Sequence, residues 1–424
     1  MKNLKFRNLV FLSLLATLFV GCGDDDELTF SDDDGTSTEV EITVSGELTE
    51  NTTWTADHIY IMDGKVIVAD GITLTIEPGT IIKGEDGLEA DASALVVDQG
   101  GKLMAEGTSS NPIIFTSVDD NIAVGEQWGT NLTTANNGLW GGVIILGKAP
   151  ISASGDSETA QIEGIAATES YGQYGGTEPG DNSGILNYIS IRHGGVTIGE
   201  DNEINGLTLG GVGSGTTISN IEIVANQDDG IEWFGGTVNV SNAIVYSQGD
   251  DGFDTDQGWS GTLSNGVVIM GENSGTGLEL DGPEGTTDYS GMMHTMENLT
   301  LIGYAGNTSS RIADFRDGNM VALSNVLVYD FGRGVRFNGN DAVSEFENGN
   351  ITFANVEVVL PDGYETAADL LSAYNDDEAS VELSTEAVDY FGANVTAIDA
   401  ASNATVGAST SVFGWTYASA QGAF

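Results

Sequence analysis

Basic residues are scarce in this sequence of 424 residues. Only 12 lysines and arginines stand against 64 aspartates and glutamates, which gives a formal net charge of −52. Such a chain has no basic surface with which to neutralise phosphates, so nucleic acid is excluded as a partner. A charge this large opposes the compact state by self-repulsion, and bound or screening cations would relieve it.

Cysteine, histidine and proline are also rare. The single cysteine, Cys22, excludes an internal disulfide framework. The three histidines, His58, His193 and His294, lie far apart, so no metal-ligand or nucleophile–base pattern can be recognised among them. No long amphipathic helical pattern occurs before residue 363. Instead, short aliphatic runs alternate with glycine, asparagine and aspartate, which predicts many short strands joined by turns.

The N-terminus is typical of a secreted protein. A basic stretch, residues 1–7, precedes an apolar run, residues 9–20, that is too short to span a membrane as a helix. Residues 18–22 resemble the lipobox of bacterial lipoproteins, which implies cleavage after residue 21 and lipidation of Cys22. A free thiol beside an ordinary cleavage site is the alternative. The acidic segment that follows, residues 22–40, is predicted to be a disordered tether and resembles the export signal of surface lipoproteins in the Bacteroidetes.

An acidic phrase returns along the chain with a period of about 22 residues. Asp228-Asp229-Gly230-Ile231-Glu232-Trp233 is followed by Asp250-Asp251-Gly252-Phe253-Asp254-Thr255, and weaker echoes begin at Gly277, Ile312 and Gly334. A fixed period of this length, with alternation inside it, predicts a solenoid whose coils stack in register. The expected fold class is therefore all-β, a right-handed parallel β-helix.

Alternation within the five repeats sorts their side chains into columns. The two inward columns are Ile231, Phe253, Leu278, Ala313 and Val335, and Trp233, Thr255, Leu280, Phe315 and Phe337. The two outward columns are Glu232, Asp254, Glu279, Asp314 and Arg336, and Phe234, Asp256, Asp281, Arg316 and Asn338. Repeated Ser-Asn steps place Asn220, Asn242, Asn265 and Asn325 at equivalent corners, where each amide is expected to hydrogen-bond to its copy on the next coil.

Further segments carry a resemblance to known proteins. Residues 73–84 (TLTIEPGTIIKG), 100–108 (GGKLMAEGT) and 111–117 (NPIIFTS) look like the first coils of pectin-lyase-like β-helix proteins. Residues 140–150, 203–217 and 232–239 resemble a family of secreted and surface proteins of Bacteroidetes. The resemblance covers roughly residues 50–360. It implies no activity, because none is established for that family and fold-level likeness does not transfer chemistry.

The acids of the repeat are candidate metal ligands. Stacked carboxylates about 4.8 Å apart repel one another, and a hard cation such as Ca²⁺ with oxygen ligands would remove that cost. The candidate ligands are Asp228, Asp229, Glu232, Asp250, Asp251, Asp254 and Asp256. The competing interpretation is a solvated acidic face whose paired aspartates shape the turns before glycine. The repeat does not match an EF-hand loop.

Catalysis is the alternative use of the same face. The candidate catalytic residues are Asp254, Glu279, Asp314, Arg316 and Arg336. A glycoside hydrolase would need two suitably spaced carboxylates, and a polysaccharide lyase would need a cation and a base. The alignment stacks Arg316 over Asp281 and Arg336 over Asp314, a pattern that salt bridges would also produce. Trp259, after a glycine on a turn, is the candidate for stacking on a sugar ring.

These observations give an expected organisation and role. The chain is expected to contain four segments in order: a signal peptide (residues 1–21), a tether (22–40), a β-helix (41–362) and a C-terminal cap with a short helix (363–424). The helix is expected in residues 363–376, and the cap is expected to cover the last coil. The expected protein is an outer-membrane lipoprotein, exposed at the cell surface, that binds a polysaccharide or a surface protein. A lyase or hydrolase of acidic polysaccharide is the alternative.

Overall fold

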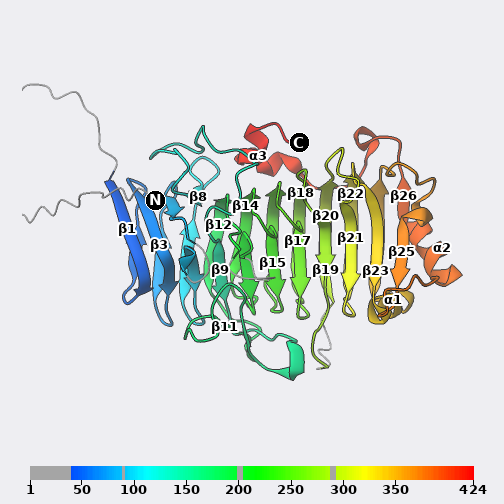
Figure 1. The fold of residues 1–424 in the computed structure, drawn as a ribbon, viewed down its shortest axis with the longest axis horizontal. Coiled ribbons are helices and arrows are strands. Elements are labelled where there is room, and N and C mark those ends of the chain that lie inside the picture. Colours follow the sequence, from blue (N-terminus) through cyan, green and yellow to red (C-terminus); the bar gives the residue numbers. More distant parts are fainter. Residues whose placement is uncertain (1–39, 88–90, 198–203, 287–292) are drawn as a thin grey trace, which may run out of the picture. The chain divides into compact units, whose positions relative to one another are not determined.

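The computed structural model describes residues 40–87, 91–197, 204–286 and 293–424. Within them, 24 strands join into one sheet that winds around a single core, and nearly all neighbours pair in parallel (Figure 1). The predicted parallel β-helix is confirmed. The signal peptide, Cys22 and all but the last residue of the tether lie outside the described residues. No helix among the described residues is long and apolar enough to cross a membrane.

The first coils have separate strands on each of three faces. Pairing joins β1 to β3, β3 to both β5 and β6, and β4 to β7. The bounds are β1 (Val40–Leu48), β2 (Thr52–Trp54), β3 (His58–Val68), β4 (Thr73–Ile76), β5 (Ile81–Gly84), β6 (Ala94–Val97), β7 (Lys102–Glu106), β8 (Ile113–Ser117) and β9 (Val143–Leu146).

From β12 (Gly184–Arg192) onward, two of the three faces are formed by one long bent strand per coil. β12 pairs with β7 through its first half and with β8 through its second half. The other bent strands are β14 (Thr217–Val224), β16 (Val240–Tyr246), β18 (Thr262–Ile269), β20 (His294–Ile302), β22 (Val321–Tyr329) and β24 (Ile351–Val358).

The third face consists of short strands, and we call it the short-strand face. After β6 and β9 it comprises β13 (Leu207–Gly210), β15 (Ile231–Phe234), β17 (Phe253–Asp256), β19 (Thr276–Leu280), β21 (Arg311–Arg316), β23 (Arg333–Asn338) and β25 (Leu371–Tyr374). Each pairs in parallel with the next, so equivalent residues lie one above another.

From β14 onward, the bend of each long strand is an asparagine corner, as predicted, whereas the bend of β12 is at Tyr188. Asn220 and Asn242 hold φ of 55°, a left-handed conformation that asparagine tolerates better than most residues. The side-chain amide of Asn242 donates to Asn220 at 3.1 Å, and that of Asn265 donates to Asn242 at 2.8 Å. Asn325 continues a second stretch of the ladder by donating to Asn298 at 3.1 Å.

The inward columns form the core. Every side chain of the two inward columns, the one that begins with Ile231 and the one that begins with Trp233, is at most 4% exposed. Aromatic rings stack along the axis, with 5.2 Å between the centroids of Phe315 and Phe337. Because burial of apolar surface drives folding, these columns are what fixes the register of the strands.

The C-terminal region differs from the prediction in two ways. Residues 363–376 do not form an α-helix: a 3₁₀ turn (Ala367–Leu370) leads into β25, which pairs with β23. Because β26 (Val395–Ala397) also pairs with β24, the solenoid continues past the expected boundary at residue 362. Helices α1 (Asn340–Glu347) and α2 (Thr385–Asn394) pack against the last coils, where Phe391 is 1% exposed.

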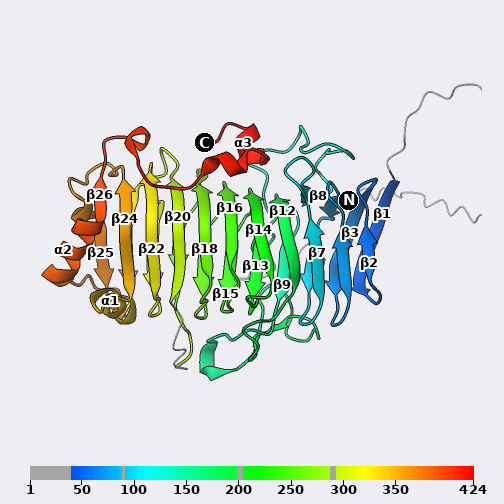
Figure 2. The same cartoon turned by 180° about the vertical axis from the view of Figure 1, so that it is seen from behind.

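The final residues do not cover the last coil but run back along the bent strands (Figure 2). Two 3₁₀ turns (Ala401–Asn403 and Thr410–Phe413) precede α3 (Tyr417–Ala420). Phe413 packs on outward aliphatic residues of β16, β18 and β20. The backbone N–H of Ala418 donates to the buried Glu222 of β14 at 2.9 Å. The predicted cap is therefore formed by α1 and α2, and the tail covers a lateral face.

A long excursion between β9 and β12 carries the hairpin β10 (Ala160–Gln161) and β11 (Gln173–Tyr174), with a 3₁₀ turn (Ser154–Asp156) before it. It leaves the coils beside β15 and β17 (Figure 1). The Tyr174 hydroxyl donates to Gln257 at 2.9 Å, and its ring lies 6.0 Å from that of Phe234. Phe234, predicted to point outward, does so, but this excursion buries it to 8% exposure.

Candidate functional site

The outward acidic column has the predicted register. Glu232 of β15 pairs with Asp254 of β17, Asp254 with Glu279 of β19, and Glu279 with Asp314 of β21. Asp314 pairs in turn with Arg336 of β23. Strand spacing in a sheet places such neighbours about 4.8 Å apart. The five catalytic candidates therefore lie on one face, because Arg316 projects from β21 on the same side.

Three of the four acids of this column are buried and the fourth, Glu279, is partly exposed, although the sequence alternation suggested an open face. Glu232 is 8% exposed, Asp254 9% and Asp314 0%. The side-chain amide of Asn205, just before β13, donates to Glu232 and also to Glu163 of the excursion at 2.9 Å. Residues outside the repeat therefore cover the column at its β13 end.

Three carboxylates form a compact group at this covered end. Oxygen atoms of Asp229, Glu232 and Asp254 all lie within 4.8 Å of one another, and all three residues are buried. A second, more open group contains Asp228, Asp229 and Asp250. We call the first group the carboxylate cluster. Carboxylate oxygens are among the ligands that Ca²⁺ prefers.

Burial controls the protonation of the cluster. It raises the pKa of Asp229, Glu232 and Asp254 well above the usual carboxyl range, and the neighbouring carboxylates raise it further. Without a cation these groups therefore favour the protonated form. A bound divalent cation would reverse that preference, since it compensates the negative charge directly.

Unpaired oxygen atoms lie in and beside the cluster. Asp254 Oδ1, Thr208 Oγ1 and Asn205 Oδ1 are buried and have no hydrogen-bond partner. Thr208 pairs in register with Glu232, so both side chains occupy the same outward column. Buried polar atoms are nearly always satisfied in folded proteins. The donor set therefore fits a cation that accepts oxygen ligands.

The paired aspartates of the repeat also have a turn-forming role, as the competing interpretation proposed. Asp229 Oδ1 accepts the backbone N–H of Asp251 at 2.8 Å, one coil further along. Asp251 Oδ1 accepts the backbone N–H of Thr276 in the same way. Asp251 thus tethers successive turns, whereas Asp229 both tethers a turn and belongs to the carboxylate cluster.

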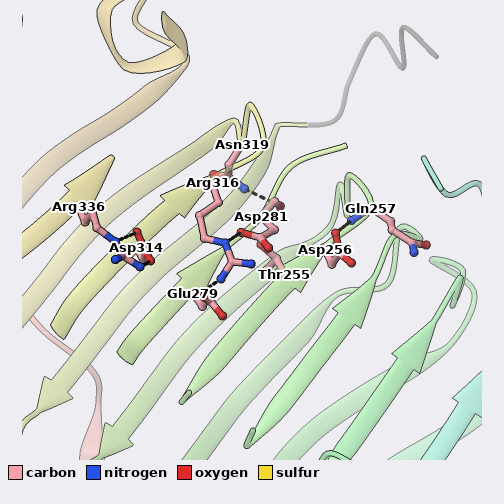
Figure 3. A network of polar contacts seen from close by, with 9 residues as sticks. All are labelled: Thr255, Asp256, Gln257, Glu279, Asp281, Asp314, Arg316, Asn319 and Arg336. Atoms are coloured by element: carbon pink, nitrogen blue, oxygen red, sulfur yellow. Dashed lines mark hydrogen bonds and ion pairs between the residues drawn. The ribbon is translucent and has the colours of Figure 1, made fainter. Parts of the chain in front are cut away.

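Asp256, also a predicted ligand, lies apart from the cluster at the end of β17. Its Oδ1 accepts the backbone N–H of Gln257 at 2.6 Å (Figure 3). Burial raises the pKa of Asp256 to about 8, with Glu284 adding to the effect. An acid with this pKa exchanges protons near neutral pH.

The arginines at the other end of the column are held in ion pairs (Figure 3). Arg336 Nε lies 2.8 Å from Asp314 Oδ1, and a second nitrogen of Arg336 pairs with the other oxygen. Arg316 Nε lies 3.0 Å from Asp281 Oδ1, and its Nη1 pairs with Glu279. The stacking of Arg316 on Asp281 and of Arg336 on Asp314 is as predicted, and the contacts are salt bridges.

Trp259 is wrong as a sugar-stacking candidate. Its side chain is 1% exposed, and its ring stacks on Trp233 with 4.7 Å between centroids. The indole N–H donates to the carbonyl of Val238 at 3.0 Å. The apolar ring fills the core beyond the end of β17, where strand alternation no longer indicates a direction.

Sequence reasoning missed Asn205, Thr208 and Glu163. Thr208 could have been found by extending the alignment one coil towards the N-terminus, since Leu207-Thr208-Leu209 matches Ile231-Glu232-Trp233. Asn205 and Glu163 lie outside the repeat, and no periodic signal marks them.

Comparison with known proteins supports the architecture. The family model of the pectate-lyase-like beta helix domain matches residues 46–418, which is most of the chain. No curated protein and no solved structure matches the chain. The extent of the family match agrees with the described coils, from β1 to the tail that packs along β14–β20. This chain therefore belongs to the pectate-lyase-like β-helix domain family.

Proposed function

We propose that this protein is a cell-surface binding module whose short-strand face is ordered by a divalent cation, Ca²⁺ in the simplest case. The observation that carries the proposal is the carboxylate cluster, three buried acids with oxygens within 4.8 Å of one another. Two unit charges at that separation repel by about 3.5 kcal/mol at an effective dielectric constant of 20. A cation held by Asp229, Glu232 and Asp254 replaces this repulsion with attraction.

The N-terminal sequence supports a place at the outer membrane. A signal peptide (residues 1–21), a lipid on Cys22 and an acidic tether (residues 22–40) would display the β-helix at the cell surface. The ligand we propose is a polysaccharide or a surface protein. Solenoids suit this role because stacked coils offer extended binding surfaces.

The state of the arginines favours binding over catalysis. Arg316 and Arg336 are each engaged by carboxylates. These salt bridges join neighbouring coils and stabilise their stacking. The partner carboxylates also raise the pKa values of the two arginines. Neither side chain is therefore poised to remove a proton from a substrate.

Thermal melting of the purified chain tests the cation. We expect the melting temperature to fall in EDTA and to recover when Ca²⁺ is added in excess. Glu232→Gln should abolish most of the response to Ca²⁺, because it removes a ligand from the cluster. Glu77→Gln is the matched control, since Glu77 is exposed on an early coil. A melting temperature that ignores both EDTA and Ca²⁺ would rule out the cation.

A polysaccharide lyase or glycoside hydrolase is the second candidate, favoured by one observation. Asp256, with a pKa of about 8, lies on the same face as Arg316, so an acid–base group and a cationic group are close neighbours. An increase in absorbance near 235 nm on incubation with polyuronates would support a lyase, and release of reducing ends without it would support a hydrolase. Neither signal is expected from a binding module.

A further inference from the structure

A groove follows the turns between the bent strands and the short strands, and no residue of the carboxylate cluster lines it. Two adjoining hollows of about 670 and 430 Å³ open where the bent strands end and the short strands begin. Tyr304 and Ala305, in the turn after β20, line both hollows. These volumes fall in the range of small-molecule sites. The lining residues include none of the cluster's acids.

The groove crosses successive coils. Most of its lining comes from the turns that follow β16, β18, β20, β22 and β24, and Thr134, Ala135, Asn137 and Ala423 complete the first hollow. Since each coil adds about 4.8 Å along the axis, five turns give a track about 20 Å long. A track of this length fits an extended chain better than a compact ligand.

The lining has a distinct chemistry. Glu272, Asp330 and Asp362 contribute carboxylates, and neither hollow is lined by lysine, arginine or histidine. An anionic ligand would therefore be repelled. The side chain of Tyr304 is 42% exposed at the centre of the groove, so one aromatic face is available for contact.

A buried amide lines the first hollow. Gln248 is 1% exposed, and its Oε1 has no hydrogen-bond partner. Its amide nitrogen is already used, since it donates to Met270 Sδ at 3.2 Å. An unpaired buried acceptor is costly to the fold and suits a ligand that brings hydroxyl donors.

We propose that this groove binds a neutral oligosaccharide. Its hydroxyls would donate to the carboxylates and to Gln248, and the apolar face of one sugar ring would lie on Tyr304. An apolar ligand would leave these acceptors unpaired, and a uronate chain would meet three like charges. This proposal rests on the proposed function, because it names the class of polysaccharide that the binding module would hold. The groove is separate from the carboxylate cluster, since the two share no residue.

The test is calorimetric titration of the purified chain with neutral hexasaccharides of glucan, mannan, xylan and galactan type. Oligogalacturonate of the same length is the competing probe. We expect at least one neutral hexasaccharide to bind, and oligogalacturonate to bind more weakly. Tyr304→Ala should weaken that binding by roughly tenfold or more, as loss of a central aromatic contact does.

Two variants separate loss of the groove from loss of the fold. Ala305→Trp places a bulky ring in both hollows and should abolish binding without lowering the melting temperature, because Ala305 is exposed. Trp128→Ala is the matched control, since Trp128 is 38% exposed and lines neither hollow.

The outcomes are distinguishable from those of the cation test. Glu232→Gln in EDTA should bind the neutral hexasaccharide as the unmodified chain does. The proposal is overturned if no neutral hexasaccharide binds at millimolar concentration, if Tyr304→Ala binds unchanged, or if oligogalacturonate binds more tightly.

Discussion

At the scale of single residues, His294 is a buried polar ring whose protonation the fold opposes. His294, at the start of β20, is 2% exposed and lies 5.1 Å from the ring of Trp259. Its Nε2 has no hydrogen-bond partner. Burial lowers the pKa of His294 to about 3. The neutral ring is therefore part of the native core.

This histidine predicts a source of acid sensitivity. Because its pKa is lower in the folded state than the usual 6.5, its contribution to stability is present above pH 6.5 and is lost as pH falls towards 3. At pH 4 the loss is about 3 kcal/mol. His294→Phe keeps a stacked ring and removes the titration, so its free energy of unfolding should fall less between pH 7 and pH 4. Equal falls for both proteins, measured by denaturant unfolding, would contradict this.

At the scale of the strand, the asparagine ladder sets the bend of each coil. Asn242 combines two properties: it adopts a φ of 55°, and it both donates to Asn220 and accepts from Asn265. A left-handed residue other than glycine or asparagine costs roughly 1–2 kcal/mol, and each hydrogen bond contributes about 1 kcal/mol.

Two substitutions at Asn242 separate these effects. Asn242→Ala loses both hydrogen bonds and must also adopt the left-handed backbone, so it should destabilise the chain by about 3–4 kcal/mol. Asn242→Gly loses the hydrogen bonds but accepts the backbone conformation, so it should be the less damaging change. Urea unfolding measures the difference. If glycine is as damaging as alanine, the φ of the corner contributes nothing.

Periodicity explains which elements could be predicted from sequence. The columns from Glu232 to Arg336 and the asparagine corners recur with each coil, so the alignment alone gave their register. Trp259 lies beyond the end of its strand, where alternation carries no information. In residues 363–376 the helix-favouring alanines and leucines give way to strand pairing with β23, because tertiary pairing overrides weak local propensity.

The cover over the acids could not be predicted, for a physical reason. It is formed by Asn205 and by an excursion that the repeat does not contain, and the contacts join residues far apart in the chain. The repeat predicts where the acids lie, on an outward face of the coils. The covering loops bury them, and this burial raises their pKa and creates the carboxylate cluster.

At the scale of the whole molecule, net charge and the cluster together predict how stability depends on pH. A carboxyl group whose pKa is higher in the folded state than in the unfolded state stabilises the fold at pH values below its unfolded-state pKa. This stabilisation is lost as the pH rises through its folded-state pKa. For Asp256 the window runs from 3.8 to about 8. Asp229, Glu232 and Asp254 act in the same direction.

In EDTA the melting temperature should therefore fall as pH rises from 5 to 8, and Asp256→Asn should reduce that slope. Ca²⁺ should raise the melting temperature strongly at pH 8 but little at pH 5, because protonated carboxyls do not bind it. Sodium chloride at matched ionic strength is the control, since screening relieves the repulsion among all 64 acids, whereas ligation acts only where carboxylates converge. Equal stabilisation by sodium chloride and Ca²⁺ at pH 8 would mean that screening of the negative charge explains the whole effect. The buried carboxyl groups would then stay protonated and bind no cation.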